Sequence, residues 1–196
     1  KKGLPNADRS VPALGISPVT FSLGDLFAGS SGGRVYKSSR GVIDWTPVVV
    51  VPGTSAVGGH VVRGFSVSPA YARDGTVFLV AEKGGAYRSE RSGEAGTWIP
   101  LPVPTSLALT SIAVSPLYNG LVDGLDEGTV YAAGEGGQVF RSANSGASWE
   151  LLDTGLAADL AVQCIAVSPQ FGRDRTLLIG YGGGDAGGIL RSKDGG

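Results

Sequence analysis

The residues best placed for chemistry are three acids, Asp123, Asp126 and Glu127, which lie close together in the 196-residue chain. They fall in an insertion, because Thr129 follows Ser115 by 14 positions whereas two related segments need only eight. Clustered carboxylates bind hard cations, and two carboxylates held about 5–9 Å apart hydrolyse glycosides. The insertion could therefore be a binding loop or a cation site, but a solvated turn is the favoured interpretation.

Other catalytic side chains are scarce. His60 is the only histidine and Cys164 the only cysteine, so a Ser-His-Asp triad, an internal disulfide and a Cys/His metal site are disfavoured. Cys164 lies in the apolar stretch 160–167, which favours a buried thiol. Residues 182–187 match the glycine pattern of dinucleotide sites, but a strand follows them instead of the required helix. We expect no catalytic residue, cofactor or metal ion.

The composition favours strands and turns. Glycine provides 33 residues and proline 11, and both interrupt helix interiors. Hydrophobic residues make up 42% and the formal net charge is −1, which disfavours a disordered chain. There is no basic stripe, so we expect no nucleic-acid partner. Apolar runs such as 48–51 are far shorter than the ~20 residues of a spanning helix, so we expect no transmembrane segment.

Three landmarks recur at a spacing near fifty residues, which is typical of a repeat architecture. One is a Ser-Pro pair. Another is an aromatic residue or Leu, then a basic residue, then Ser. The last is a tryptophan. The pairs begin at Ser17, Ser68, Ser115 and Ser168, the second landmark ends at Ser38, Ser89, Ser142 and Ser192, and the tryptophans are Trp45, Trp98 and Trp149.

Each repeat reads as four short strands, which in the third unit are residues 111–116, 129–133, 138–142 and 149–152. The second strand is apolar on both faces, which predicts a sheet that is covered on both sides. Blades that pack face to face around an axis provide such burial. For residues 1–196 we predict an all-β propeller with four-stranded antiparallel blades of about 50 residues, in an incomplete ring of about four blades. The blade units are approximately 12–52, 60–104, 109–153 and 162–196.

The turn before the tryptophan has a pattern of its own. Residues 142–149 read Ser-Ala-Asn-Ser-Gly-Ala-Ser-Trp, which resembles the Asp-box, Ser-x-Asp-x-Gly-x-Thr-Trp. Arg40 and Arg91 stand at the acidic place in the first two units, which predicts looser turns there. The residues expected to build these turns are Ser38, Trp45, Ser89, Trp98, Ser142, Asn144, Gly146, Trp149, Ser192 and Asp194.

The chain thus resembles the Asp-box, or bacterial neuraminidase repeat, propellers. This superfamily includes sialidases, sortilin ectodomains, xyloglucanase-like glycosidases and photosystem II assembly factors. The resemblance implies that the Asp-boxes lie at the blade periphery, away from any active site. It also implies an exported protein, which is periplasmic, secreted or on the cell surface.

Two sets of charged residues recur at fixed places in the repeat, which favours structural roles over catalysis. A sialidase-type arginine triad is therefore disfavoured. The sets are Lys37, Arg88, Arg141 and Arg191 on the third strand, and Asp74, Asp126 and Asp174 just before the second.

These observations leave three functional hypotheses. The first is a non-enzymatic interaction module that presents loops to a protein or a glycan, as part of a larger assembly. The second is a piece of an Asp-box glycoside hydrolase, and the third is an assembly factor of the photosystem II type. Because both ends interrupt the repeat pattern, we expect the missing blades in the same chain or from a neighbour.

Overall fold

Strands dominate the computed structural model, which describes residues 4, 10–18, 24–39, 44–48, 60–83, 85–120 and 128–196. In these ranges the strands form four antiparallel sheets, three with four strands and one with three. Within each sheet the strands lie in chain order, so turns connect them. Glycine and proline favour such turns, and their abundance is explained by this topology.

The first sheet consists of β1 (Ala13–Ile16), β2 (Leu26–Gly29), β3 (Val35–Ser38) and β4 (Thr46–Val48). The second consists of β5 (Val62–Val67), β6 (Val77–Ala81), β7 (Gly85–Ser89) and β8 (Trp98–Leu101). The third consists of β9 (Leu109–Val114), β10 (Val130–Gly134), β11 (Val139–Ser142) and β12 (Glu150–Leu152). The fourth consists of β13 (Ala161–Val167), β14 (Leu177–Gly183) and β15 (Ala186–Ser192). Two one-turn helices, which the sequence did not predict, are α1 (Tyr71–Asp74) and α2 (Phe171–Asp174).

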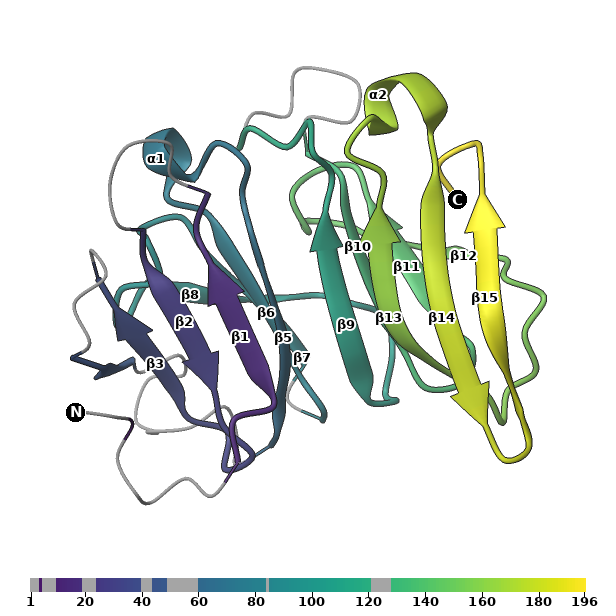
Figure 1. Cartoon of the computed structure of the whole chain (residues 1–196), viewed down its shortest axis with the longest axis horizontal. Coiled ribbons are helices and arrows are strands. Elements are labelled where there is room, and N and C mark those ends of the chain that lie inside the picture. The colour runs from purple at the N-terminus through teal and green to yellow at the C-terminus, as the bar shows by residue number, and fades with distance from the viewer. Residues whose placement is uncertain are drawn as a thin grey trace.

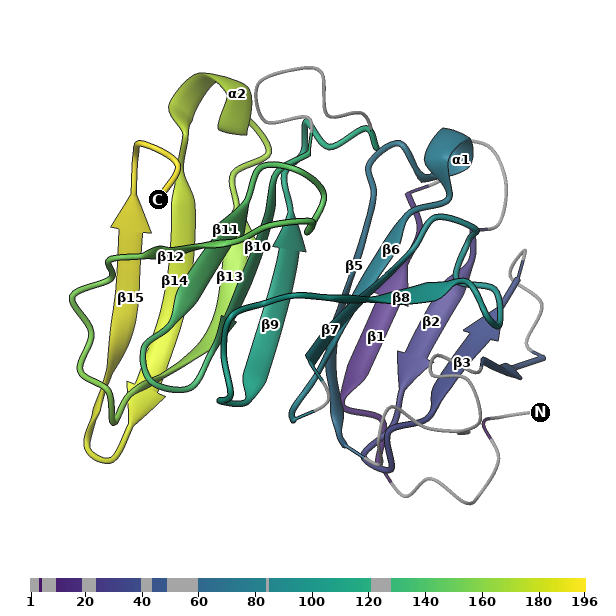
Figure 2. The ribbon, with the colours of Figure 1, turned by 180° about the vertical axis from the view of Figure 1, so that it is seen from behind.

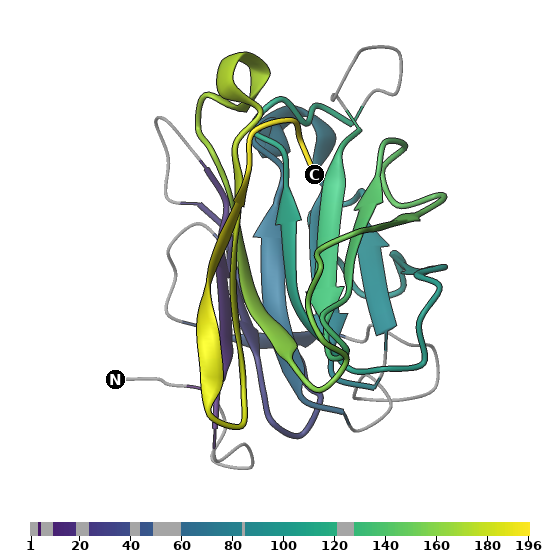
Figure 3. The ribbon, with the colours of Figure 1, turned by 90° about the vertical axis from the view of Figure 1, so that its right-hand side faces the viewer.

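The four sheets follow one another in a row from the N-terminal to the C-terminal end (Figure 1). The first strand of each sheet contacts the first strand of the next, from β1 through β5 and β9 to β13. The last strands β8 and β12 lie on the opposite side, which is in front in Figure 2. Figure 3 looks along the row from the fourth sheet. This arrangement confirms the predicted incomplete ring of antiparallel sheets.

The second strand of an inner sheet buries side chains on both faces. Along β6, Val77 and Leu79 pack toward the first sheet, whereas Phe78 and Val80 pack toward the third. All four side chains are fully buried. Burial of one such side chain contributes about 1.5–3 kcal/mol. The two apolar faces seen in the sequence therefore correspond to two neighbouring sheets.

Edge-on aromatic contacts, which we call the aromatic wedges, join each sheet to the preceding one. The inserted ring lies three residues after the serine of a Ser-Pro pair, and it meets a ring on the second strand of the preceding sheet. Edge-to-face packing is a preferred geometry for aromatic pairs. With their centroid distances and interplanar angles, the pairs are Phe27–Tyr71 (6.4 Å, 82°), Phe78–Tyr118 (5.5 Å, 87°) and Tyr131–Phe171 (6.2 Å, 76°).

Side-chain hydrogen bonds close the Ser-Pro corners. The Ser68 hydroxyl donates to Asp74 Oδ2 at 2.6 Å, and the backbone N–H of Thr76 donates to Asp74 Oδ1 at 2.8 Å. The corner of the fourth sheet repeats these bonds with Ser168 and Asp174, and they lower the pKa of the Asp174 carboxyl. In these two corners the recurring aspartate forms the turn, as the sequence predicted.

The two sheets at the ends of the row each expose an apolar face. On the first end face, Leu14 and Ile16 of β1 are 71% and 70% exposed. The last end face carries Cys164, Leu178 and Ile189, and Ile189 is 75% exposed. The exposed Cys164 corrects the prediction of a buried thiol. Its strand is apolar on both faces, but no described sheet covers the outer one.

We expect Phe78→Ala to lower the free energy of unfolding by about 3–5 kcal/mol, because it removes the ring beneath Tyr118 and leaves a cavity. Ile99→Ala is the control, since Ile99 is 46% exposed, and should cost less than about 1 kcal/mol. Urea denaturation followed by circular dichroism measures both. If both variants lost the same free energy of unfolding, the aromatic wedge would not be what stabilises the packing between these sheets.

Candidate binding cleft between the third and fourth sheets

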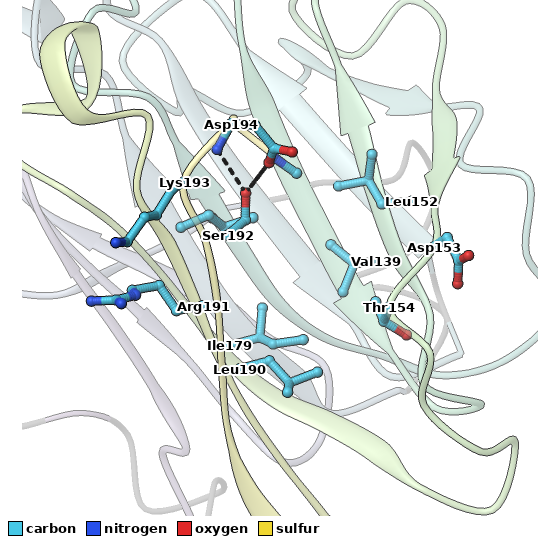
Figure 4. A pocket seen from close by; sticks show the side chains of 12 residues that line it. Val139, Leu152, Asp153, Thr154, Ile179, Leu190, Arg191, Ser192, Lys193 and Asp194 are labelled. Carbon is cyan, nitrogen blue, oxygen red and sulfur yellow. Dashed lines mark hydrogen bonds between the residues drawn. The ribbon is translucent and has the colours of Figure 1, made fainter.

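A cleft of about 530 Å³ opens between the third and fourth sheets. Its floor is apolar, with Val139 and Leu152 from the third sheet and Leu177, Ile179 and Leu190 from the fourth. Figure 4 shows Val139 and Leu152 facing Ile179 and Leu190 across the opening. Its volume lies within the range of ligand sites, which are mostly apolar with a few polar groups.

Polar residues surround this floor. Asp153 and Thr154 follow β12 on one side, and Lys193 and Asp194 follow β15 on the other. The side chains of Arg191 and Lys193 extend away from the apolar floor (Figure 4). Side chains alternate between the two faces of a strand, so Leu190 points into the cleft while Arg191 points out of it.

Asp194 is held by the turn in which it lies. The Ser192 hydroxyl donates to its Oδ1 atom, and the backbone N–H of Gly196 donates to the same oxygen at 3.2 Å. These hydrogen bonds lower the pKa of Asp194 below its usual value of 3.8. A general acid of glycoside hydrolysis needs a raised pKa, so this carboxylate is better suited to shaping the turn.

The turn from Ser142 to Trp149 is built by side-chain hydrogen bonds. The Ser142 hydroxyl oxygen accepts the backbone N–H groups of Asn144 and Gly146, at 3.2 and 2.8 Å. Asn144 Oδ1 accepts the backbone N–H of Ser148 at 2.8 Å. The indole N–H of Trp149 donates to the Gly146 carbonyl at 3.0 Å, which joins the end of the turn to its middle.

The second sheet has the same arrangement despite Arg91 at the acidic place. Ser89 Oγ accepts the backbone N–H groups of Arg91 and Gly93, both at 3.2 Å. Thr97 shares a 2.6 Å hydrogen bond with the Ser89 hydroxyl, and Trp98 donates to the Gly93 carbonyl at 3.3 Å. The serine thus keeps the contacts that define the turn. Its bond from Gly93 (3.2 Å) and the bond from Trp98 (3.3 Å) are longer than the corresponding 2.8 and 3.0 Å of the third sheet, which agrees with the looser turn expected in this unit.

The remaining predicted residues have mixed outcomes. Ser38 is buried at the end of β3, and Trp45 is half-buried just before β4. The insertion acids Asp123, Asp126 and Glu127 lie outside the described residues, as does Arg40. Within the described ranges, no group of three or more His, Cys, Asp or Glu residues could hold a metal ion. In the same part of the chain, no helix has the length and apolar character to cross a membrane.

The repeated basic residues serve structural roles, as predicted, in three of the four units. The three ion pairs are Lys37–Asp25 (2.9 Å), Arg88–Glu90 (2.9 Å) and Arg141–Glu150 (3.1 Å). Burial by itself raises the pKa of Asp25, but hydrogen bonds from Tyr71 and Lys37 and the charge of Lys37 outweigh it, so the pKa is lowered. Asp25 thereby joins the first sheet to Tyr71 of the second.

The edge of β15 borders the cleft. In the other sheets the third strand pairs with a fourth, β3 with β4, β7 with β8 and β11 with β12. No described strand pairs with β15 on the side away from β14. A strand edge of this kind can accept an extended segment.

Solved structures share this arrangement. YCF48 bound to D1 peptide matches with a TM-score of 0.58 and 21% identity, over 90% of this chain and 49% of that chain. The GH74 enzyme of Niastella koreensis matches with a TM-score of 0.67 and 16% identity, over 94% of this chain and 29% of that one. The WD40 β-propeller domain of Doa1 matches with a TM-score of 0.60 and 13% identity, over 94% of this chain and 51% of that one. The chain has a β-propeller fold.

Each of the four sheets is a propeller blade, and the chain spans about half or less of the length of these three structures. Neither a protein-family model nor a curated protein matches the sequence. The propeller fold is shared by proteins with unlike functions, so the likeness gives the fold alone.

The residues that line the cleft were not predicted as a site. Leu152, Ile179 and Leu190 have the composition of an ordinary core, and nothing in their types marks a cleft. The repeat does hold a usable signal, because Leu152 and Ile179 occupy the repeat positions of Leu101 and Ala132, which belong to the cluster of Trp149. Aligning the apolar residues as well as the serines would have found them.

We expect nuclear magnetic resonance titration to give Asp194 a pKa below 3.8, and Ser192→Ala to raise it toward that value. The sign follows because the serine hydroxyl donates to the ionised form, and its loss makes ionisation harder. Asp174, whose lowered pKa comes from its own serine, Ser168, is the control whose titration should not change on Ser192→Ala. An Asp194 pKa that is unaffected by Ser192→Ala would refute this account of the turn.

Proposed function

We propose that this propeller is a non-enzymatic protein-interaction module that binds an extended polypeptide segment in the cleft between the third and fourth sheets. The observation that carries the proposal is the apolar floor beside the unpaired edge of β15. A peptide that adds a strand to such an edge gains affinity from backbone hydrogen bonds. Every second side chain of that peptide would enter the cleft, which supplies specificity.

One of the comparisons supports a protein partner. YCF48 is a propeller whose structure contains a bound D1 peptide, which is the precedent for peptide binding and for the assembly-factor alternative. The GH74 enzyme is the precedent for the glycosidase alternative. Asp194, one of the cleft carboxylates, is bound within its own turn by Ser192 and Gly196, which favours a structural role for it.

Membership of the Asp-box superfamily and an exported location are part of the same proposal. The contacts of Ser142, Asn144 and Gly146 support the Asp-box assignment, because the short polar side chains bind their own turn backbone. The exported location, whether periplasmic, secreted or at the cell surface, rests on that resemblance. The four approximate blade units of the sequence analysis are likewise retained as the proposed repeat boundaries.

The end faces support a place in a larger assembly. Leu14 and Ile16 stand at the repeat positions of Phe65 and Val67, which pack against the first sheet. Leu178 stands at the position of Phe78, which packs against the third. We propose that further blades, from the same chain or from a neighbour, cover these faces.

The cleft is tested with a fluorescent peptide that has the sequence of residues 147–154, Ala-Ser-Trp-Glu-Leu-Leu-Asp-Thr. Anisotropy should show saturable binding to the 196-residue chain, and Leu190→Glu should weaken it at least about tenfold by placing a charge in the apolar floor. Ile189→Glu is the matched control, because its side chain lies on the opposite face of β15. If the peptide bound the parent chain and Leu190→Glu with equal affinity, the cleft would not be its binding site.

The end faces are tested with the double variant Leu14→Glu/Ile16→Glu. We expect it to bind roughly half as much of the dye 8-anilinonaphthalene-1-sulfonate as the parent, because it removes exposed apolar surface. Its free energy of unfolding should change by less than about 1 kcal/mol. Unchanged dye fluorescence would show that the first end face is not an accessible apolar patch.

A further inference from the structure

We infer that the outer edge of β12, in the third sheet, is a strand-addition site for a partner segment in which two apolar residues lie between two basic ones. The outer edge is the side of β12 that faces away from β11. No described strand pairs with β12 on that side. Such an edge presents a row of backbone N–H and C=O groups to other chains. This site is separate from the cleft between the third and fourth sheets and does not depend on the function proposed there.

A proline protects the corresponding edge in the first and second sheets. Pro47 of β4 pairs with Tyr36, and Pro100 of β8 pairs with Tyr87. A proline within an edge strand stands where the N–H group would face away from the sheet, because it has no N–H to give to the ladder. Proline at this position therefore removes the donor that an added strand would use.

The third sheet has leucine at this position. Leu151 of β12 pairs with Phe140, which lies just before the basic residue of its strand, as Tyr36 and Tyr87 do. The equal register gives Leu151 the outward backbone direction of the two prolines, and Leu151 keeps its N–H group. The sequence has no proline from residue 117 to residue 168. The protection of the first two sheets is therefore missing from the third.

The side chain of Leu151 adds an apolar contact to this edge, because 60% of it is exposed. Phe140 pairs with both Leu151 and Ala132, so the three side chains lie on one face, and Ala132 packs toward the second sheet. Leu152 lies on the other face, in the cluster shared with the fourth sheet. Leu151 is thus exposed at the rim of a face that already has a described neighbour, unlike the residues of the end faces.

Two exposed acidic residues flank the pair of leucines, with Glu150 before them and Asp153 after them. Glu150 forms an ion pair with Arg141 at 3.1 Å, so one of the two negative charges is balanced and the edge keeps an excess of negative charge. The corresponding residues of the second sheet are Ile99 and Pro102. The acidic flanks are therefore a feature of the third sheet and favour a basic partner.

Strand register defines the segment that fits. All described strand pairs are antiparallel, so the added strand is taken as antiparallel as well. Apolar residues then lie opposite Leu151 and Leu152, and basic residues lie opposite Glu150 and Asp153. A second copy of this chain fits less well, because two β12 strands paired at Leu151 would bring their acidic residues together.

The probe is a fluorescein-labelled peptide with the sequence Thr-Lys-Val-Val-Lys-Thr. At low salt, anisotropy should show saturable binding to the 196-residue chain. Leu151→Pro, which copies the first two sheets, should weaken binding at least about tenfold, because it removes the N–H group and the leucine side chain. Leu151→Ala keeps the N–H group and should weaken binding about two- to fivefold. Ile99→Ala, at an exposed position of β8, is the matched control and should bind as the parent does.

Backbone methylation of the peptide distinguishes strand addition from simple attraction of charges. In the antiparallel register the second valine lies opposite Leu151 and its N–H points toward β12, whereas the N–H of the first valine points away. N-methylation of the second valine should weaken binding at least about tenfold, and N-methylation of the first less than about twofold. Replacing both lysines by glutamate should weaken binding about three- to tenfold.

The outcomes decide the inference whether or not Leu151→Pro folds, which circular dichroism checks, because the methylated peptides and Leu151→Ala use a chain with its backbone intact. Equal binding of the two methylated peptides would overturn strand addition, and so would a folded Leu151→Pro that binds as the parent does. Binding that is lost in Leu190→Glu but kept in Leu151→Pro would assign the peptide to the cleft instead. If the parent chain is an oligomer that Leu151→Pro dissociates, the occupant is a second copy, and the partner-segment inference is overturned.

Discussion

Packing between neighbouring sheets is the constraint on which the structure depends. A single small sheet of strands this short is marginal by itself, so each one needs apolar neighbours. Along β6, Val77 and Phe78 face different sheets, and this alternation links three sheets through one strand. The aromatic wedges then fix the corner of each sheet against the preceding one, at centroid distances near 6 Å.

Sequence periodicity predicted the sheets well, because every unit must present the same strands to its neighbours. The fourth sheet has three strands, because residues 168–196 contain no tryptophan-led strand. The periodicity could not place Cys164, whose exposure depends on whether another sheet covers the outer face of β13. The cleft could not be predicted from the sequence either, because it depends on how the third and fourth sheets lie relative to each other.

The turns before the tryptophans show which part of a motif matters physically. The Asp-box motif has an acidic residue two positions after its serine, and Arg91 at that position predicted a weakened turn. Yet Ser89 and Ser142 make the same pair of backbone contacts, and Thr97 adds a hydroxyl contact in the second sheet. The serine and the glycine therefore define the turn, and the residue between them adjusts it.

The order of the sheets also determines how the molecule opens. Because the described sheets pack mainly against those beside them, stability is close to a sum of nearest-neighbour terms. Backbone amides of β6 and β10, which are covered on both sides, should exchange with deuterium only on global unfolding. Those of β1 and β15 should exchange through partial openings that leave the middle of the row intact.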